Sequence, residues 1–360
     1  MSSIILFIVI LSLLVLVHEA GHFFTALWTG MKVEEFGIGF PPRLASVRRR
    51  GIRYSFNWIP IGGFVKIKGE TGEDRDDSEA FVSKPAWKRL LVLSAGVLMN
   101  LIFAIVLLSA GFLFGMPQVV DESLSTQAIV QNVNVQVYTV VEGSAAAQVG
   151  IEVGDGITKI DDLVVTKSEQ AQAYIQEYSD KELSLTVKRG DDYYTYVVVP
   201  TELPETEGRK VLGVGMVTVG SVSYPWYLAP VKGIEATVSL AVQMIIALVD
   251  LVKGLIIEQR VAVDLSGPIG IAVITGEVAQ LGISHIIMFT ALLSINLAII
   301  NFLPFPALDG GRALFVLVEK LRGKPVSAKA ETVAHNIGFV MLMILILVVT
   351  FKDIFGLVVK

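Results

Sequence analysis

The chain opens with an apolar run that ionisable side chains interrupt. The stretch "LLVLVHEAGHFFTALW", residues 13–28, places two histidines and a glutamate among apolar residues. Hydrophobic residues make up 53% of the 360-residue chain and the mean hydropathy is +0.65, which indicates several membrane helices plus some soluble mass. Ionisable groups inside a membrane helix are costly and usually functional, so this run predicts a site rather than a plain anchor.

Four apolar runs approach the length of about 20 residues that a helix needs to cross a bilayer. They cover residues 4–24, 90–115, 286–303 and 337–357. The first run lacks the basic start and the small-residue cleavage site of a signal peptide, so we interpret it as retained. A fifth stretch, 236–249, has only 14 residues between two acidic side chains. We therefore expect it to lie in or near the outer interface.

Basic residues orient these spans. Residues 25–89 hold 12 Lys and Arg, whereas residues 116–230 hold 7 Lys and Arg against 16 Asp and Glu. The positive-inside rule then predicts a cytoplasmic 25–89 loop, with the N-terminus and the 116–230 region outside. His18 lies about 21 Å along a helix from residue 4 at 1.5 Å per residue, so the site is expected towards the cytoplasmic side.

The interrupted run carries the pattern H-E-x-x-H. His18 and His22 are four residues apart and share one helix face, and Glu19 follows the first histidine. Two such imidazoles can hold Zn²⁺ while the glutamate acts as general base in hydrolysis. A chance match to a five-residue pattern is the alternative. Because the chain has no cysteine, any metal must be held by His, Asp or Glu.

A catalytic zinc site has three protein ligands and an open position. The best candidate for the third ligand is Asp309 in "NFLPFPALDGGR", residues 301–312, where prolines and glycines predict irregular backbone that can line a cavity. An ordinary Asp-Gly turn is the alternative. We expect His285 and His335, at span ends, to be interfacial side chains. Asp309 can reach the histidines only if residues 116–285 make no net crossing, so a spanning 236–249 helix would remove the site.

With these two motifs and the order of the spans, nearly the whole chain resembles the site-2 proteases, which are intramembrane zinc metalloproteases of peptidase family M50. The resemblance is to the bacterial group that includes the regulator of sigma-E protease. It implies that His18, His22 and Asp309 hold one Zn²⁺ and that Glu19 is the catalytic base. It also implies cleavage of single-span membrane proteins in or near their transmembrane segment, such as anti-sigma factors or remnant signal peptides.

Three asparagines lie in stretches that the resemblance makes relevant. Asn296 and Asn301, in "SINLAIINFLPFPALDGG", match family asparagines linked to substrate or transition-state binding. Helix–helix hydrogen bonding is the alternative for both. Asn100 ends "SAGVLMN", which resembles the family's Gly-Pro-x-x-Asn stretch, with Val97 where proline is usual.

A second feature lies in the cytoplasmic loop. "YSFNWIPIGGFVKIKG", residues 54–69, alternates apolar and polar residues around Gly62 and Gly63 and predicts a short hairpin. In the family such a segment dips into the membrane near the active site. An edge strand there can pair with an unwound substrate backbone, which is a substrate-binding role for the two glycines. A purely structural hairpin is the alternative.

The middle region predicts a separate β-rich domain. Residues 116–220 contain short β-type runs, and residues 140–165 resemble a PDZ domain. Such a domain could bind a peptide by strand addition, or act as a size filter against substrates with bulky outer domains. The sequence favours neither role.

The expected fold is a polytopic α-helical membrane protein with four transmembrane helices and one inserted extracytoplasmic PDZ-like β-rich domain. Its parts are a membrane core at 1–115 and 286–360, the PDZ-like domain at 116–220 and a linker at 221–285. The resemblance implies the bacterial inner membrane, with the lipid bilayer and membrane-protein substrates as partners and no nucleic acid. A metal-dependent scaffold and a metal transporter are rivals, but Glu19 argues against the first and the lack of an evident inverted repeat against the second.

Overall fold

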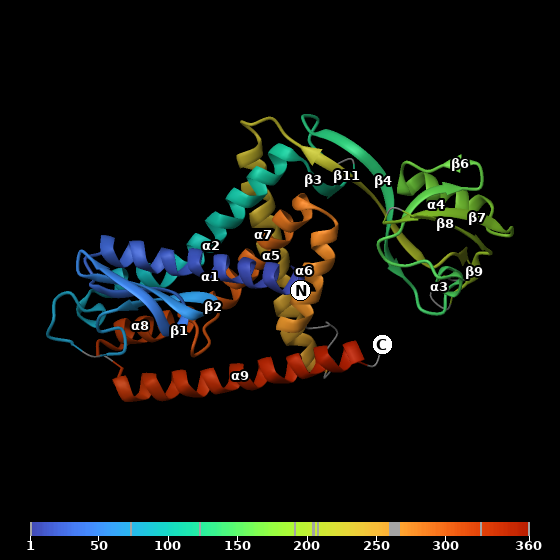
Figure 1. Ribbon diagram of the computed structural model, residues 1–360. Coiled ribbons are helices and arrows are strands. Elements are labelled where there is room, and N and C mark those ends of the chain that lie inside the picture. The colour runs from blue at the N-terminus through green and yellow to red at the C-terminus, as the bar shows by residue number, and fades with distance from the viewer. Residues whose placement is uncertain are drawn as a thin grey trace. The chain divides into compact units, whose positions relative to one another are not determined.

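The computed structural model describes residues 2–72, 74–121, 124–190, 192–203, 206, 209–258, 267–324 and 326–358 (Figure 1). The chain divides into two compact units. The first unit joins residues 1–110 to residues 230–360, and the second is residues 111–229.

Helices dominate the first unit. They are α1 (Ser2–Trp28), α2 (Ala86–Phe114), α5 (Ala229–Lys253), α6 (Pro268–Gln280), α7 (Ile283–Phe302), α8 (Asp309–Arg322) and α9 (Ala328–Val358), with a 3₁₀ turn at Phe81–Ser83 and a π-helical turn at Gly254–Glu258. Five of these helices, α1, α2, α5, α7 and α9, are long and apolar enough to cross a membrane. The protein is therefore a multi-pass membrane protein with five candidate spans.

The expected count of four spans is not confirmed because α5 is longer than the sequence predicted. The helix continues through Glu235 and Asp250, the two acidic residues taken as limits of the 236–249 stretch, and reaches 25 residues. Charged residues near the ends of an apolar helix do not stop it, since their side chains can extend towards water. Whether α5 crosses the membrane or lies at the outer interface stays a prediction, and so does the condition that a spanning helix here would remove the metal site. The expected ligands do converge in this structure.

The loop between α1 and α2 forms a sheet from two long bent strands, β1 (Val33–Arg49) and β2 (Ile52–Ile67). Residues 35–38 of β1 pair with residues 53–56 of β2 on one side and with residues 63–66 on the other. The two arms of the predicted 54–69 hairpin therefore flank β1 instead of pairing with each other. The 63–67 arm is the sheet edge that borders α1.

Two close approaches position the site within this unit. A Cβ on Gly21 of α1 would lie 2.4 Å from the carbonyl oxygen of Ala95 on α2, so only glycine allows the two helices to pack this tightly. A Cβ on Gly311 of α8 would lie 2.2 Å from the carbonyl oxygen of Phe305. The glycine therefore lets the start of α8 fold back against the turn that follows α7.

The second unit is β-rich. Its main sheet has the order β3-β11-β4-β5-β7-β8, all antiparallel, with β6 paired to β5. The strands are β3 (Met116–Val119), β4 (Ile129–Val140), β5 (Gly156–Ile160), β6 (Leu163–Val164), β7 (Leu183–Arg189), β8 (Asp192–Val198) and β11 (Val214–Ser223). Two short strands, β9 (Thr201–Glu202) and β10 (Lys210–Val211), pair with each other, and the helices are α3 (Ala145–Val149) and α4 (Ser168–Glu177).

The core of this unit is built from residues that alternate along the strands. Val135, Ile157, Leu185 and Val187 are almost fully buried, together with Ala171 of α4. Burial of such side chains is the main stabilising contribution to a sheet packed on one face by helices. The β-rich domain that the sequence predicted is therefore present as a compact unit with its own core.

Candidate metal centre

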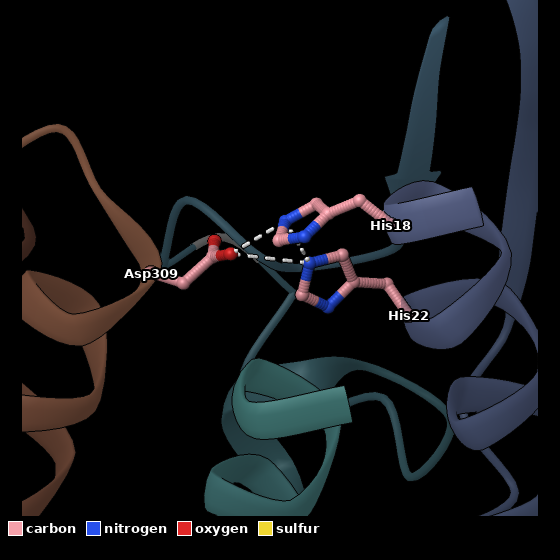
Figure 2. Close-up of side chains that lie close together, drawn as sticks. All are labelled: His18, His22 and Asp309. Carbon is pink, nitrogen blue, oxygen red and sulfur yellow. Dashed lines mark hydrogen bonds and ion pairs between the residues drawn. The ribbon is translucent and has the colours of Figure 1, made fainter. Parts of the chain in front are cut away.

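Three side chains from two distant helices converge inside the first unit (Figure 2). The Nε2 atoms of His18 and His22, on α1, lie 3.1 Å apart. One carboxylate oxygen of Asp309, the first residue of α8, lies 2.9 Å from the His18 Nε2 and 3.2 Å from the His22 Nε2. Both histidines are buried, and the Asp309 side chain is 21% exposed. The sequence expected these three residues to meet, and they do.

This donor set fits a zinc ion. Two ligand atoms bound to one tetrahedral zinc at about 2.0–2.1 Å lie about 3.3 Å apart, and the three separations here come within about 0.5 Å of that value. Two imidazoles and one carboxylate are also a ligand combination typical of catalytic zinc sites. Each residue contributes one atom, so a further position around the ion stays open for water or substrate.

Second partners orient both imidazole rings. The His22 Nδ1 donates to the backbone carbonyl of Val92 on α2 at 2.8 Å, which leaves the Nε2 lone pair free for a metal. The His18 Nδ1 faces the side-chain amide of Asn100, also on α2, at 3.4 Å. Asn100 is fully buried, and its Oδ1 has no hydrogen-bond partner among the described residues. With Oδ1 turned towards the ring, His18 donates from Nδ1 and its Nε2 also faces the metal as an acceptor.

Gly96 of α2 leaves room for the two rings. A Cβ at this position would lie 2.5 Å from the His22 Nε2 and 2.7 Å from the His18 Nε2. No ordinary side-chain carbon approaches a nitrogen this closely, so any residue larger than glycine would displace the imidazoles or fill the space of the ion. We call the space between Gly96 and the two imidazole rings the candidate metal cradle.

Glu19 lies beside the three ligands. Its carboxylate lines a cavity of about 240 Å³ together with His22 and Asp309. The Oε2 atom accepts a hydrogen bond from the backbone N–H of Val65 at 2.9 Å. Val65 belongs to the edge arm of β2, so its N–H points away from the sheet and towards α1. This hydrogen bond fixes the carboxylate at the wall of the cavity.

An ion pair closes the cavity on the side of the loop between β2 and α2. Arg312 of α8 and Glu70 both line the cavity, and their side chains are joined by a salt bridge. Arg312 follows Asp309 by three residues, so the two side chains lie on the same face of α8. A second ion pair, between Arg89 of α2 and Glu319 of α8 at 2.5 Å, connects α8 directly to α2.

The two asparagines of α7 do not join this cluster. Asn296 is exposed and Asn301 is half-buried. Neither residue lines the cavity, and neither side chain makes a hydrogen bond to a described residue. Gly62 and Gly63 lie on β2 against α1. A Cβ on Gly62 would come within 3.2 Å of the Val15 side chain, and the Gly62 N–H donates to the Ser12 hydroxyl at 3.3 Å. Gly62 therefore allows β2 to approach α1 closely, whereas a Cβ on Gly63 would lie 2.8 Å from the Gly37 carbonyl oxygen of β1, so Gly63 allows the two strands to pair.

Some contacts of the site had no usable signal in the sequence. The Val65 N–H and the Val92 carbonyl are backbone groups, so any residue type other than proline could supply the first and any residue the second. Gly96 and Asn100 both fall in "SAGVLMN", so the resemblance noted above marks the right stretch. The sequence expectation that His335 is an interfacial side chain also misses its contact with the turn before Asp309.

Comparisons with known proteins agree on one family. The family model described as peptidase family M50 matches residues 6–345. Zinc metalloprotease RasP of Oceanobacillus iheyensis is 30% identical over 442 residues, which cover 98% of this chain and 99% of RasP. CPE1693 of Clostridium perfringens strain 13, named as an inferred zinc metalloprotease, is 35% identical over 349 residues, which cover 95% of this chain and 96% of the relative.

Among solved structures, the chain matches the PDZ domain of the SdrC-like protein Lin2157 from Listeria innocua. That match has 24% sequence identity and a TM-score of 0.21, and it covers 23% of this chain and 92% of the PDZ domain. The PDZ assignment of the β-rich unit stays a prediction from the sequence.

Proposed function

The chain belongs to peptidase family M50 and is a zinc metalloprotease, and on this premise we propose that it hydrolyses peptide bonds of membrane proteins at the site formed by His18, Glu19, His22 and Asp309. One observation carries the proposal. The His18 Nε2 and an Asp309 carboxylate oxygen, which are 291 residues apart in the chain, lie 2.9 Å from each other. They lie inside a unit that contains helices long and apolar enough to cross a membrane.

We assign the ligand role to His18, His22 and Asp309. When bound, Zn²⁺ supplies a Lewis acid that polarises the scissile carbonyl and lowers the pKa of water towards 7. The chain holds the three donor atoms in place through the Val92 carbonyl, the Asn100 amide and the helix start at Asp309. These partners hold the ligands in one arrangement, so little reorganisation is needed during the reaction.

Glu19 is the proposed general base. Its carboxylate lines the cavity next to the ligands, within reach of a water molecule there. It accepts the proton of the attacking water and then donates it to the leaving amine. The Val65 N–H holds the carboxylate at the cavity wall through this exchange.

The proposed substrate class is supported by the apolar helices around the cavity. A helix in a bilayer must unwind before a protease can reach its scissile bond, and the freed backbone groups then need partners. The 63–67 arm of β2 is the sheet edge beside Glu19, and we propose that an unwound substrate segment pairs with it near Gly62 and Gly63, displacing contacts that this edge now makes to α1. Asn301 and Asn296 of α7 are proposed to contact the substrate chain, because neither is used by a described internal hydrogen bond.

The proposed substrate is a single-span protein of the bacterial inner membrane, trimmed first on its outer side. The N-terminus and the β-rich unit are then extracytoplasmic, as the 12 basic residues of the 25–89 loop favour. Within that arrangement the PDZ-like unit either binds a peptide or excludes substrates with bulky outer domains. Cleavage releases a cytoplasmic fragment or clears a remnant signal peptide.

Cleavage of a tagged single-span substrate by the purified full chain in detergent tests this proposal. Wild type should cleave, lose activity with a zinc chelator and regain it with added zinc. Glu19→Gln should keep zinc and lose cleavage, whereas the matched carboxylate change Glu277→Gln, at an exposed position of α6, should cleave like wild type. Equal cleavage by Glu19→Gln and wild type would show that another group is the base.

A further inference from the structure

The turn that precedes Asp309 adopts a backbone conformation that its sequence does not favour. Ala307 has a φ of 80°, in the left-handed region that L-residues other than glycine rarely adopt. Ala307 also lines the cavity, two residues before Asp309. A conformation of this kind persists only where surrounding contacts hold it, and such residues cluster at functional sites.

The contact that holds Ala307 comes from α9. The Ala307 backbone N–H donates to the His335 Nδ1 at 2.9 Å, across 28 residues of sequence. The His335 ring packs against the Phe315 ring of α8, with the ring centroids 5.8 Å apart. The imidazole therefore lies between α8 and the turn, and its acceptor nitrogen is directed at Ala307, the residue of this turn that has a positive φ.

The same face of α9 approaches the turn at a second point. Gly338 follows His335 by three residues and is buried, and a Cβ there would lie 2.3 Å from the carbonyl oxygen of Pro306. Most of α9 beyond this face is exposed within the unit. The helix thus contacts the turn through one glycine, which permits the approach, and one histidine, which supplies the hydrogen bond.

Of the two ring nitrogens of His335, only Nδ1 takes part in a hydrogen bond with a described residue. His335 Nε2 has no hydrogen-bond partner among the described residues, and the nearest carboxylate oxygen, from Glu331 one helical turn earlier, is 4.0 Å away. Because Nδ1 accepts from the backbone, the neutral ring carries its proton on Nε2. His335 is not one of the three clustered candidate ligands, and its hydrogen bond is to the backbone of the turn.

We propose that His335 is a positioning residue, which holds Ala307 in the left-handed conformation so that Asp309 reaches His18 and His22. The proposal rests on the ligand role of Asp309 proposed above. It assigns to α9 a function in the metal centre although α9 contributes no metal ligand. Without the hydrogen bond, the turn would sample other backbone conformations and Asp309 would leave the two imidazoles part of the time.

Zinc retention against a competing chelator, measured on the purified full chain in detergent, tests the proposal without using activity. His335→Leu should lower zinc affinity by about tenfold, the lower end of the effect of removing a partner that orients a metal ligand. His335→Asn should stay within about twofold of wild type, because its amide oxygen can take the place of Nδ1. His285→Leu is the matched control. It removes an imidazole near the start of α7, at the end of the helix away from the turn, and should leave zinc affinity unchanged.

A double variant separates positioning from packing. Glycine adopts a positive φ readily, so adding Ala307→Gly to His335→Leu should restore most of the zinc affinity. If the double variant binds zinc as weakly as His335→Leu, or if His335→Leu binds like wild type, the positioning role is wrong. Asp309→Ala is the reference. If Asp309→Ala keeps wild-type zinc affinity, the ligand role of Asp309 is wrong. If Asp309→Ala loses zinc affinity while His335→Leu does not, only the role of His335 is wrong.

Discussion

The Glu19 carboxylate accepts a hydrogen bond from the backbone N–H of Val65 at 2.9 Å. This contact joins the helix that carries both histidines to the edge arm of the sheet in the following loop. The group proposed to move the proton and the strand proposed to pair with substrate are therefore in direct contact. A substrate segment that adds to this edge arrives beside the general base.

We expect Val65→Pro to lower kcat by about 10- to 100-fold, because the Glu19 carboxylate then has no fixed position in the cavity. Proline is tolerated at a sheet edge, and it removes only the N–H that points away from the ladder. Zinc content should stay at the wild-type level. Val65→Ala, which keeps the N–H, is the control and should retain most of the activity. Steady-state cleavage kinetics and a zinc assay measure both effects.

Gly96→Ala should abolish stoichiometric zinc binding. The added methyl group would lie 2.5 Å from the His22 Nε2, and the helix backbone of α2 cannot move away without breaking the Val92 and Asn100 contacts. Gly356→Ala, in α9, places a methyl group where no described residue lies within 4 Å and should leave zinc binding unchanged. Metal analysis of the purified variants decides the outcome, and a zinc-loaded Gly96→Ala protein would contradict this view of the cradle.

The local part of the site was predictable from sequence because helix geometry is local. The spacing of His18 and His22 places both rings on one face of any α-helix, and a buried pair of this kind needs a partner. Asp309 was chosen as that partner because prolines and glycines around it indicate irregular backbone at membrane depth. The structure brings these residues together, and their individual roles stay predictions.

Long-range pairing was not predictable in the same way. The alternation in residues 54–69 indicated strands, but nothing in it shows that both arms pair with 35–38. Sheet register depends on contacts between distant segments, whereas periodicity reports only the exposure of each residue. The length of α5 is also underestimated from the sequence. Acidic residues such as Glu235 suggest a helix boundary, but the helix extends past it.

Asn100→Leu should lower zinc affinity by about 10- to 100-fold, because the His18 ring loses the partner that selects its orientation and its protonated nitrogen. Asn100→Asp keeps an oxygen that can accept from Nδ1, and we expect it to bind zinc more tightly than Asn100→Leu. The Ser294 hydroxyl donates to the Asn100 backbone carbonyl, which both variants preserve. Chelator competition on all three proteins ranks the affinities, and equal affinity of Asn100→Leu and wild type would exclude the orienting role.

The β-rich unit offers a stability test that is independent of the zinc site. The Asp155 side chain is 1% exposed and pairs with Arg189 through two hydrogen bonds, from Nε at 2.7 Å and from a terminal nitrogen at 2.8 Å. Arg189→Leu leaves this carboxylate buried without its partner. Because the Arg189 side chain is 32% exposed, we expect the unit to lose about 2 kcal/mol of unfolding free energy, less than when one member of a fully buried ion pair is removed.

Glu152→Ala is the matched control for that change. Glu152 pairs with the same guanidinium at 2.8 Å, but its side chain is 65% exposed, so water already screens the interaction. Its removal should cost under about 1 kcal/mol. Thermal unfolding of the full chain, followed by protease susceptibility of the region between β4 and β11, separates the two variants. If both variants unfold at the same temperature, burial of Asp155 does not control the stability of the unit.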